Sequence, residues 1–260
     1  MRRPVLAPLN QRIAEMQMRA TRFLVPLLAF LLGATTSAHA TSVSPMHLEM
    51  ASVGHAGRSQ FTVANTGTEP MPVETTVKRV EIEEDGTNHQ SPADEDFLVF
   101  PAQIIIPPGG SQVFRVQWVG EPNLAASQTY MIGVTQIPLK QPNNKSVVQV
   151  VMAFGVVVDV APPEGHSDLK VTGAQIVTDK KGKRHVAFTV SNSSNVHGLL
   201  DNAVVTISSG GWSKSYSSGE IAQGIGIGIV QPGKRRVFTL PGDLPADVSA
   251  LQVRLDQPKQ

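Results

Sequence analysis

The sequence contains no cysteine, which excludes disulfide bonds, thiolate metal ligands and thiol nucleophiles. Secreted folds of small size often depend on disulfides, so this chain must be held together by core packing. Aromatic residues make up only 5% of the 260 residues. The sequence also lacks His-x-x-x-His, His-Glu-x-x-His and Gly-x-Ser-x-Gly spacings. We therefore expect no enzyme activity, no cofactor and no metal site.

Long apolar runs are also scarce, and the clearest one lies near the start of the chain. It extends from Phe23 to Ala34, follows Arg19 and Arg22, and precedes Ala38–Ala40 (AHA). Twelve residues are too few to span a bilayer comfortably, and the small-x-small sequence suits signal peptidase. The alternatives are a membrane anchor or a core helix. We predict that residues 1–40 are a cleaved secretory signal peptide.

The mature chain is slightly acidic, although the whole chain carries a formal charge of +1. Removal of the leader takes away five arginines and one glutamate, which leaves a net charge of −3. The excess of basic residues therefore belongs to the leader. We expect neither nucleic acid nor an anionic membrane as a partner. We also expect no membrane insertion after signal removal, and a location beyond the inner membrane.

Apolar and polar residues alternate along most of the mature chain. This period of two is typical of half-buried β-strands, and turn-forming residues interrupt it every 8–15 residues. Frequent short strands of this kind favour an all-β sandwich or barrel. The alternating apolar positions include Met46, Leu48 and Met50, then Phe61 and Val63, then Val73 and Val77.

Two sequence markers occur twice in the same order. Phe61–Asn65 (FTVAN) recurs as Phe188–Asn192 (FTVSN), and Pro108–Phe114 (PGGSQVF) recurs as Pro232–Phe238 (PGKRRVF). The two markers begin 47 residues apart in the first half and 44 residues apart in the second. This repeat predicts two domains of the same sandwich type. The alternative is convergent turn chemistry within one solenoid.

The predicted boundary between the domains is Ala161–Gly165 (APPEG). Two prolines and a glycine end a strand there and form a short, stiff elbow. The N-terminal domain would cover residues 41–161 and the C-terminal domain residues 162–260. Such a linker would hold the sandwiches at an angle, with a cleft between them.

The strand before the elbow is the most apolar segment of the mature chain. Val147–Val158 reads VVQVVMAFGVVV and contains no charged residue. Such a strand is usually buried on both faces, so a central core strand is the simplest interpretation. However, it follows the polar loop Lys140–Ser146 (KQPNNKS) and leads directly into the elbow. These neighbours favour a strand that contacts a partner.

Together these features resemble the periplasmic pilus (fimbrial) chaperones of the chaperone–usher pathway. The resemblance covers nearly all of residues 42–260 and implies an all-β fold of two immunoglobulin-like β-sandwiches in a boomerang arrangement. Each motif is short, but their order and spacing are specific. The motifs are Phe100-Pro101, Ile106-Pro107-Pro108-Gly109, Phe114-Arg115-Val116, Tyr130 with Ile132 and Val134, Ile137-Pro138, and Ala161-Pro162.

The resemblance also implies a mechanism. Pilus subunits are similar to immunoglobulin sandwiches that lack their last strand, and the chaperone supplies a strand to the open groove. The chaperone would thereby prevent subunit aggregation and deliver the subunit to an outer-membrane usher in the periplasm. Its partners would be pilins and the usher, with no cofactor. The inserting side chains would be Val148, Val150, Met152 and Phe154.

The chain departs from the family at the expected anchor of the subunit's terminal carboxylate. Well-known members use an arginine on the first strand and a lysine at the end of the donor strand, but here Glu49 and Val157 occupy these positions. Neither can hold a carboxylate, which implies a divergent branch. Arg115 is our candidate anchor, and Lys78 and Arg79 are alternatives. An arginine on the solvated face of a strand is the simpler interpretation of Arg115.

Two other functions compete with the chaperone. A periplasmic copper-binding β-sandwich could use Met46, His47, Met50 and His55, since methionine and histidine suit copper. Alternation instead predicts that Met46 and Met50 face the core while His47 points outwards. A pilin or adhesin would be a single domain with a flexible donor extension, which two matched domains and a short lead do not suit.

Overall fold

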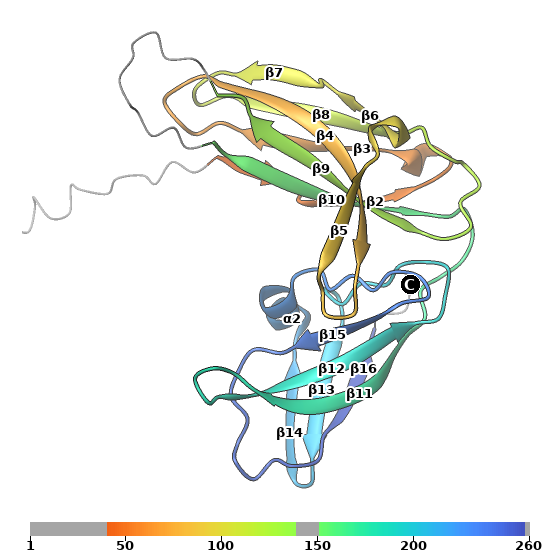
Figure 1. The fold of residues 1–260 in the computed structure, drawn as a ribbon, viewed down its shortest axis with the longest axis vertical. Helices are drawn as coiled ribbons and strands as arrows, with labels where there is room; N and C mark the ends of the chain where they lie inside the picture. Colours follow the sequence, from red (N-terminus) through yellow and green to blue (C-terminus); the bar gives the residue numbers. More distant parts are fainter. Residues whose placement is uncertain (1–40, 139–150, 258–260) are drawn as a thin grey trace, which may run out of the picture. The chain divides into compact units, whose positions relative to one another are not determined.

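The computed structural model describes residues 41–138 and 151–257, so the predicted signal peptide and the residues Val148 and Val150 lie outside the described part. Strands dominate this part of the chain and form four sheets (Figure 1). Two sheets use only strands from residues 42–161, and the other two use only strands from residues 169–256. The predicted all-β class is confirmed.

The first pair of sheets contains ten strands. One sheet has the order β1-β3-β8-β6; the other has the order β2-β10-β9-β4-β5, with β7 also paired to β4. Two short 3-10 helices, η1 (His55–Gly57) and η2 (Asp94–Asp96), connect strands. The strands are β1 (Ser42–Ser44), β2 (His47–Ala51), β3 (Arg58–Ala64), β4 (Met71–Ile82), β5 (Asn88–Pro92), β6 (Phe97–Phe100), β7 (Gln103–Ile106), β8 (Ser111–Trp118), β9 (Gln128–Gln136) and β10 (Ala153–Ala161).

The second pair of sheets contains six strands in two three-stranded sheets, with the orders β11-β12-β15 and β14-β13-β16. One α-helix, α2 (Ser218–Ile225), follows β14. The strands are β11 (Leu169–Thr178), β12 (Arg184–Asn192), β13 (Val204–Ser209), β14 (Trp212–Tyr216), β15 (Arg235–Thr239) and β16 (Gln252–Asp256).

Each pair of sheets encloses its own apolar core, as the alternating pattern predicts. In the first sandwich, Phe61 and Phe114 from one sheet meet Ile132 and Val158 from the other. The second core draws on all of its sheets in the same way and includes Phe188, Phe238, Val205 and Ile207. The chain therefore contains two β-sandwiches. Among the described residues, no helix is long and apolar enough to cross a membrane.

The internal repeat corresponds to the same structural unit in both sandwiches. Phe61 on β3 is the register partner of Phe114 on β8, and their rings stack with centroids 5.1 Å apart. Phe188 on β12 and Phe238 on β15 are register partners in the same way, with centroids 5.7 Å apart. The repeated FTV and VF motifs thus form a cross-strand aromatic pair in each core.

The asparagine that ends each FTVxN motif is buried and closes the adjacent turn. The Asn65 side chain donates to the carbonyl of Ile106 at 3.0 Å, and its oxygen accepts from the Gly67 N–H. Asn192 donates to the carbonyl of Val230 at 2.9 Å and accepts from the Ser194 N–H. These matched contacts explain why the repeat includes the asparagine.

The helix α2 ends within a segment of alternating glycines. The alternating glycines of Gly224–Gly228 suggest an extended segment, yet the first two residues of this segment belong to the helix. A capping box forms the helix N-terminus, because Ser217 and Glu220 exchange hydrogen bonds. Gly226 ends the helix at a φ of 68°, which favours glycine.

The second sandwich contacts the end of β4 in the first. The buried Gln231 side chain accepts from the Ile82 N–H and donates to the Val80 carbonyl, both at 2.8 Å. Val80, Ile82 and Ile229 form a third apolar cluster, against which Val157 packs. Residues 41–260 accordingly form one compact unit.

Candidate functional site

Strands β2 and β10 pair in parallel, and their register brings three ionisable side chains together. His47 is the partner of Val157, and Glu49 is the partner of Asp159. Leu48 on β2 and the even-numbered valines of β10 point into the first core. Since side chains alternate along a strand, His47, Glu49 and Asp159 share the opposite face.

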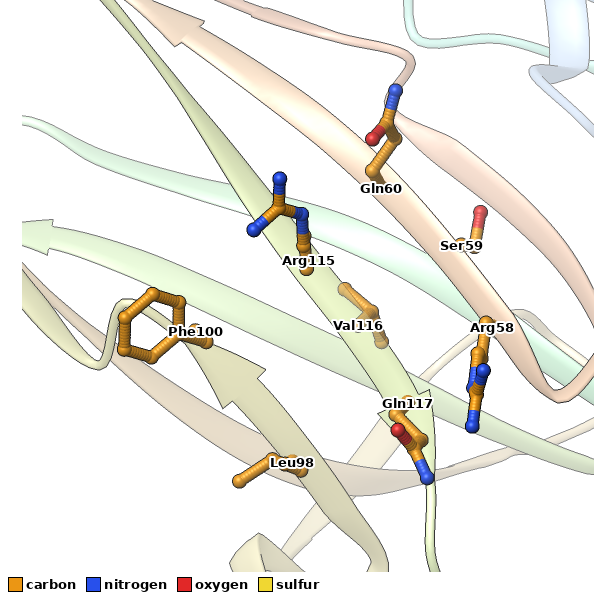
Figure 2. Close-up of a pocket in the computed structure, with 8 residues that line it drawn as sticks. All are labelled: Arg58, Ser59, Gln60, Leu98, Phe100, Arg115, Val116 and Gln117. Atoms are coloured by element: carbon orange, nitrogen blue, oxygen red, sulfur yellow. The ribbon is translucent and has the colours of Figure 1, made fainter.

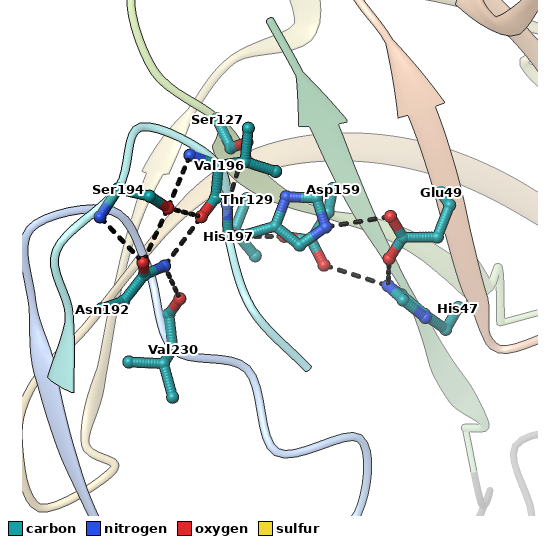
Figure 3. Close-up of polar contacts among 10 residues, drawn as sticks. All are labelled: His47, Glu49, Ser127, Thr129, Asp159, Asn192, Ser194, Val196, His197 and Val230. Atoms are coloured by element: carbon teal, nitrogen blue, oxygen red, sulfur yellow. Dashed lines mark hydrogen bonds and ion pairs between the residues drawn. The ribbon is translucent and has the colours of Figure 1, made fainter. Parts of the chain in front are cut away.

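These three side chains contact one another directly (Figure 3). The His47 Nε2 atom lies 3.0 Å from Asp159 Oδ2 and 3.1 Å from Glu49 Oε1. Asp159 is fully buried, whereas the Glu49 side chain is about half exposed. The Thr129 hydroxyl on β9 donates to the other Asp159 oxygen at 2.6 Å, which orients this carboxylate towards His47.

A histidine from the second sandwich completes the cluster. His197 Nε2 lies 2.9 Å from Glu49 Oε2, and the His197 side chain is almost fully buried. Its backbone N–H donates to the Ser127 hydroxyl at 3.1 Å, which ties its loop to the first sandwich. On the other side of the loop, Asn192 donates to the Val196 carbonyl at 2.8 Å. Figure 3 shows this chain of contacts from Val230 to His47.

Charge complementarity sets the protonation of the cluster. Burial alone lowers the pKa of His47, but its hydrogen bonds to Asp159 and Glu49 outweigh burial and raise the pKa to about 9. Burial alone raises the pKa of Glu49, yet the hydrogen bonds from His197 and His47 hold it at about 2. Burial also lowers the pKa of His197, and the hydrogen bond to Glu49 reverses this shift. Both histidines therefore favour the charged form next to two carboxylates.

The beginning of β10 has a sheet edge that is open in the described part of the chain. On one side, β10 pairs with β9 from Ala153 to Val160. On the other side it pairs with β2 only from Val157 to Ala161. The stretch Ala153–Val156 thus presents an unpaired edge among the described residues. Because an open edge is a template for pairing with another chain, this stretch is a candidate binding site.

Residues 48–163 match the family model of the pili and flagellar-assembly chaperones, PapD N-terminal domain. The chain belongs to the PapD-like pilus chaperones. The match includes the open edge of β10 and two members of the ionisable cluster, Glu49 and Asp159. This assignment confirms the resemblance seen in the sequence and the expectation of a non-enzymatic protein.

Two solved structures of chaperones, CfaA and YadV, have a similar fold. The class 5 fimbriae chaperone CfaA is 13% identical, with a TM-score of 0.50 over 85% of this chain and 100% of that chain. The YadV chaperone is 12% identical, with a TM-score of 0.50 over 83% of this chain and 91% of that chain. The E. coli chaperone DraB is 19% identical, with a TM-score of 0.45 over 78% and 87%. The curated proteins contain no significant match.

The predicted inserting set of the chaperone falls on two parts of the chain. Val148 and Val150 lie outside the described residues. Met152 and Phe154 are half-buried and pack at the margin of the first core. They continue the face formed by the fully buried valines of β10, so the apolar face extends beyond the core. β10 itself begins at Ala153, within the predicted strand.

Arg115, the predicted carboxylate anchor, lies on β8. Its neighbours in sequence, Phe114 and Val116, are buried, so Arg115 points to the exposed face of the β1-β3-β8-β6 sheet. There it lines a shallow pocket with Arg58, Leu98 and other residues (Figure 2). Of the two alternatives, Lys78 is exposed and Arg79 contacts Glu81 at 3.4 Å.

The two positions that depart from the family have different surroundings here. Glu49 contacts two histidines, which compensate its charge. Val157 packs in the apolar cluster with Val80, Ile82 and Ile229. The position expected to carry a lysine thus makes apolar contacts between the sandwiches.

The methionines and histidines considered for copper binding lie in different environments from one another. Met50 is buried in the first core as expected, but Met46 is 55% exposed, so the prediction that it faces the core is wrong. Met46 precedes β2, whose alternation starts at His47. His47 is not a free outward residue either, because two carboxylates contact its Nε2 atom.

Sequence reasoning missed Asp159, Thr129 and His197. Asp159 carries a recognisable signal, since it is a single carboxylate within the apolar run Val156–Ala161. A charge at a buried strand position requires a partner. The partner His47 is 112 residues away in sequence, and only the pairing of β2 with β10 reveals it.

Proposed function

We propose that this chaperone binds pilus subunits by donor-strand complementation, using the beginning of β10 and the residues before it. It prevents subunit aggregation in the periplasm and delivers the subunits to an outer-membrane usher. The observation that carries this proposal is the open edge at Ala153–Val156, next to an apolar face that continues past the core.

Two physical effects support binding at this edge. The backbone of β10 offers unpaired N–H and C=O groups to an added strand. The side chains of Met152 and Phe154 offer apolar surface, and full burial of each contributes roughly 1.5–3 kcal/mol. A subunit groove that lacks one strand would gain both effects at once, and its own exposed edge would be covered.

The proposal is tested with a pilus subunit from the same genome, co-expressed with the untagged chaperone in the periplasm. Met152→Glu and Phe154→Glu should each lower the affinity for the subunit by about tenfold or more, because about 1.4 kcal/mol corresponds to a factor of ten. Val150→Glu tests the part of the set outside the described residues. The readouts are co-purification and protection of the subunit from protease.

The matched control is Val151→Glu, which places the same charge at the neighbouring position of opposite parity. Val151 is 44% exposed, so the change should leave folding intact. Far-UV circular dichroism verifies the fold of every variant. Equal protection by Phe154→Glu and wild type would exclude the proposed inserting set, and an equal loss in Val151→Glu would exclude the alternating face.

The carboxylate anchor is tested separately. Arg115 remains our sequence-based candidate, and Arg236 on β15 is a second one. Arg236 lines a cavity of about 260 Å³ together with Val157 and Thr129. It donates to the Ile229 carbonyl at 2.8 Å, and its buried Nε has no hydrogen-bond partner in the described part. An unpaired guanidinium N–H beside Val157 could bind a carboxylate.

Arg115→Gln and Arg236→Gln are compared on a full-length subunit and on one with an amidated C-terminus. Loss of the anchoring arginine should lower the affinity for the subunit with a free carboxylate and leave the affinity for the amidated subunit unchanged. If both variants bind the two subunits like wild type, neither arginine is the anchor.

A further inference from the structure

The geometry points to a divalent transition-metal site formed by His47, Glu49 and Asp159, with Zn²⁺ as the fitting ion. The cluster offers one imidazole nitrogen and two carboxylate oxygens, and these three atoms all lie within 4.8 Å of one another. Zn²⁺ accepts both nitrogen and oxygen ligands, whereas Ca²⁺ and Mg²⁺ prefer oxygen alone. This site goes beyond subunit binding and uses residues outside the open edge.

Two of the three separations within the cluster are close to those of a metal coordination shell. Ligand atoms about 2.0–2.2 Å from a tetrahedral Zn²⁺ lie about 3.3–3.6 Å from one another. The two separations that involve His47 Nε2 are 3.0 Å to Asp159 and 3.1 Å to Glu49. The ligands thus need to move apart by only a few tenths of an ångström to admit the ion between them.

The His47 Nε2 atom is shared between two carboxylate oxygens. The His47 Nε2 atom carries at most one proton, yet two carboxylate oxygens lie at hydrogen-bonding distance from it. One N–H can point directly at only one of them. A divalent cation would contact all three atoms and would displace the His47 proton, because a ligating imidazole nitrogen is deprotonated. Its charge would then replace that of His47 beside the two carboxylates, one of which is fully buried.

The surrounding residues orient the ligands as in protein metal sites. Thr129 donates to Asp159 Oδ1 and leaves Oδ2 directed at His47. His197 contacts Glu49 Oε2 and leaves Oε1 directed at His47. Outer partners of this type commonly change metal affinity by about 10–100-fold when they are removed. Because His197 belongs to the second sandwich, bound metal would also strengthen the contact between the sandwiches.

The test uses the untagged unit of residues 41–260, treated with chelator and titrated with Zn²⁺ by calorimetry at neutral pH. Wild type should bind one equivalent and gain thermal stability, because an ion that binds only the folded state raises Tm. His47→Gln and Asp159→Asn should lose this equivalent. His197→Gln should retain it with an affinity about 10–100-fold lower.

His55→Gln is the matched control, since His55 is exposed and belongs to the methionine–histidine segment considered for copper. It should bind Zn²⁺ like wild type. Cobalt provides an independent signal, because Co²⁺ at a site of low coordination number gives visible absorption that His47→Gln should abolish. Asp159 is buried, so Asp159→Asn could lose metal binding through misfolding. His47 is partly exposed, so His47→Gln should fold and separates loss of the ligand from loss of the fold.

Three results would overturn the proposal. One is the absence of a Zn²⁺ equivalent in wild type. Another is unchanged binding and an unchanged Co²⁺ spectrum in folded His47→Gln. Loss of the equivalent in His55→Gln instead would assign the metal to the methionine–histidine segment and would equally contradict the His47–Glu49–Asp159 site.

Discussion

Each sandwich contains one turn closed by an asparagine and one cross-strand aromatic pair, but the two sandwiches differ at their sheet edges. Both outer strands of each sheet in the second sandwich carry a basic residue, which discourages pairing with other chains. The open stretch of β10 in the first sandwich carries no charge from Ala153 to Val158. The basic residues of the second sandwich are Lys170 on β11, Arg235 on β15, Lys214 on β14 and Arg254 on β16.

This difference shows that topology alone does not separate a binding sandwich from a supporting one. Both sandwiches are built from the same repeated markers and both have strands at sheet edges. In the first sandwich, the outer strands β1 and β6 and the start of β10 all lack charged residues. The short overlap of β2 with β10 leaves the start of β10 unpaired among the described residues.

The largest expected effect is the loss of an aromatic pair. Phe61→Ala and Phe188→Ala should each lower the free energy of unfolding by about 3–5 kcal/mol, because each removes a fully buried ring and leaves a cavity. Urea unfolding followed by circular dichroism measures both. If one variant cost less than about 1 kcal/mol, the two pairs would not be equivalent.

A smaller effect is expected at the turn asparagines. Asn65→Ala and Asn192→Ala should each cost about 1–3 kcal/mol, because each removes several side-chain hydrogen bonds that close its turn. Asn192→Ala should also weaken binding of Zn²⁺ at the proposed site, since Asn192 organises the loop that carries His197. Asn65→Ala is the matched control, as its turn does not contact that loop, and an equal effect on Zn²⁺ would contradict this interpretation.

The smallest effect concerns the contact between the sandwiches. Lys234 Nζ lies 2.6 Å from Glu81 Oε2, but both side chains are more than one third exposed. A double-mutant cycle with Glu81→Gln and Lys234→Met should give a coupling energy of about 0.2–1 kcal/mol at low salt. Added salt should reduce it further. A coupling above 2 kcal/mol would show that this ion pair, rather than Gln231 and the apolar cluster, dominates the contact.

Much of the fold follows from local sequence patterns. Alternation in Phe61–Val63 and in Tyr130–Val134 correctly predicts the buried faces of β3 and β9. The repeated FTVxN and PGxxxVF markers correctly predict two equivalent sandwiches. The helix α2 also has a local signal, the capping pair Ser217 with Glu220, although the glycines that follow favour an extended segment. Each of these features depends on residues that are near one another in sequence, so a local sequence pattern can predict it.

The site was only partly predictable, because most of its contacts join residues that are distant in sequence. The sequence indicated the apolar donor strand and showed that Glu49 and Val157 do not fit the family's basic pair. It did not indicate that Glu49 is compensated by His47 and His197, nor that Asp159 lies beside them. The expectation of no metal site rested on short-range spacings, which do not reveal side chains that meet from distant strands.

By itself, the sequence determined the strand class, the duplication and the uncharged strand before the elbow, because side-chain alternation and turn chemistry act over a few residues. The tertiary structure decided which edge of β10 stays open and which side chains meet. The parallel register of β2 with β10 places Glu49 opposite Asp159 and brings His47 to both. Their separation in sequence is so long that only the packing of the whole sandwich can specify the contact.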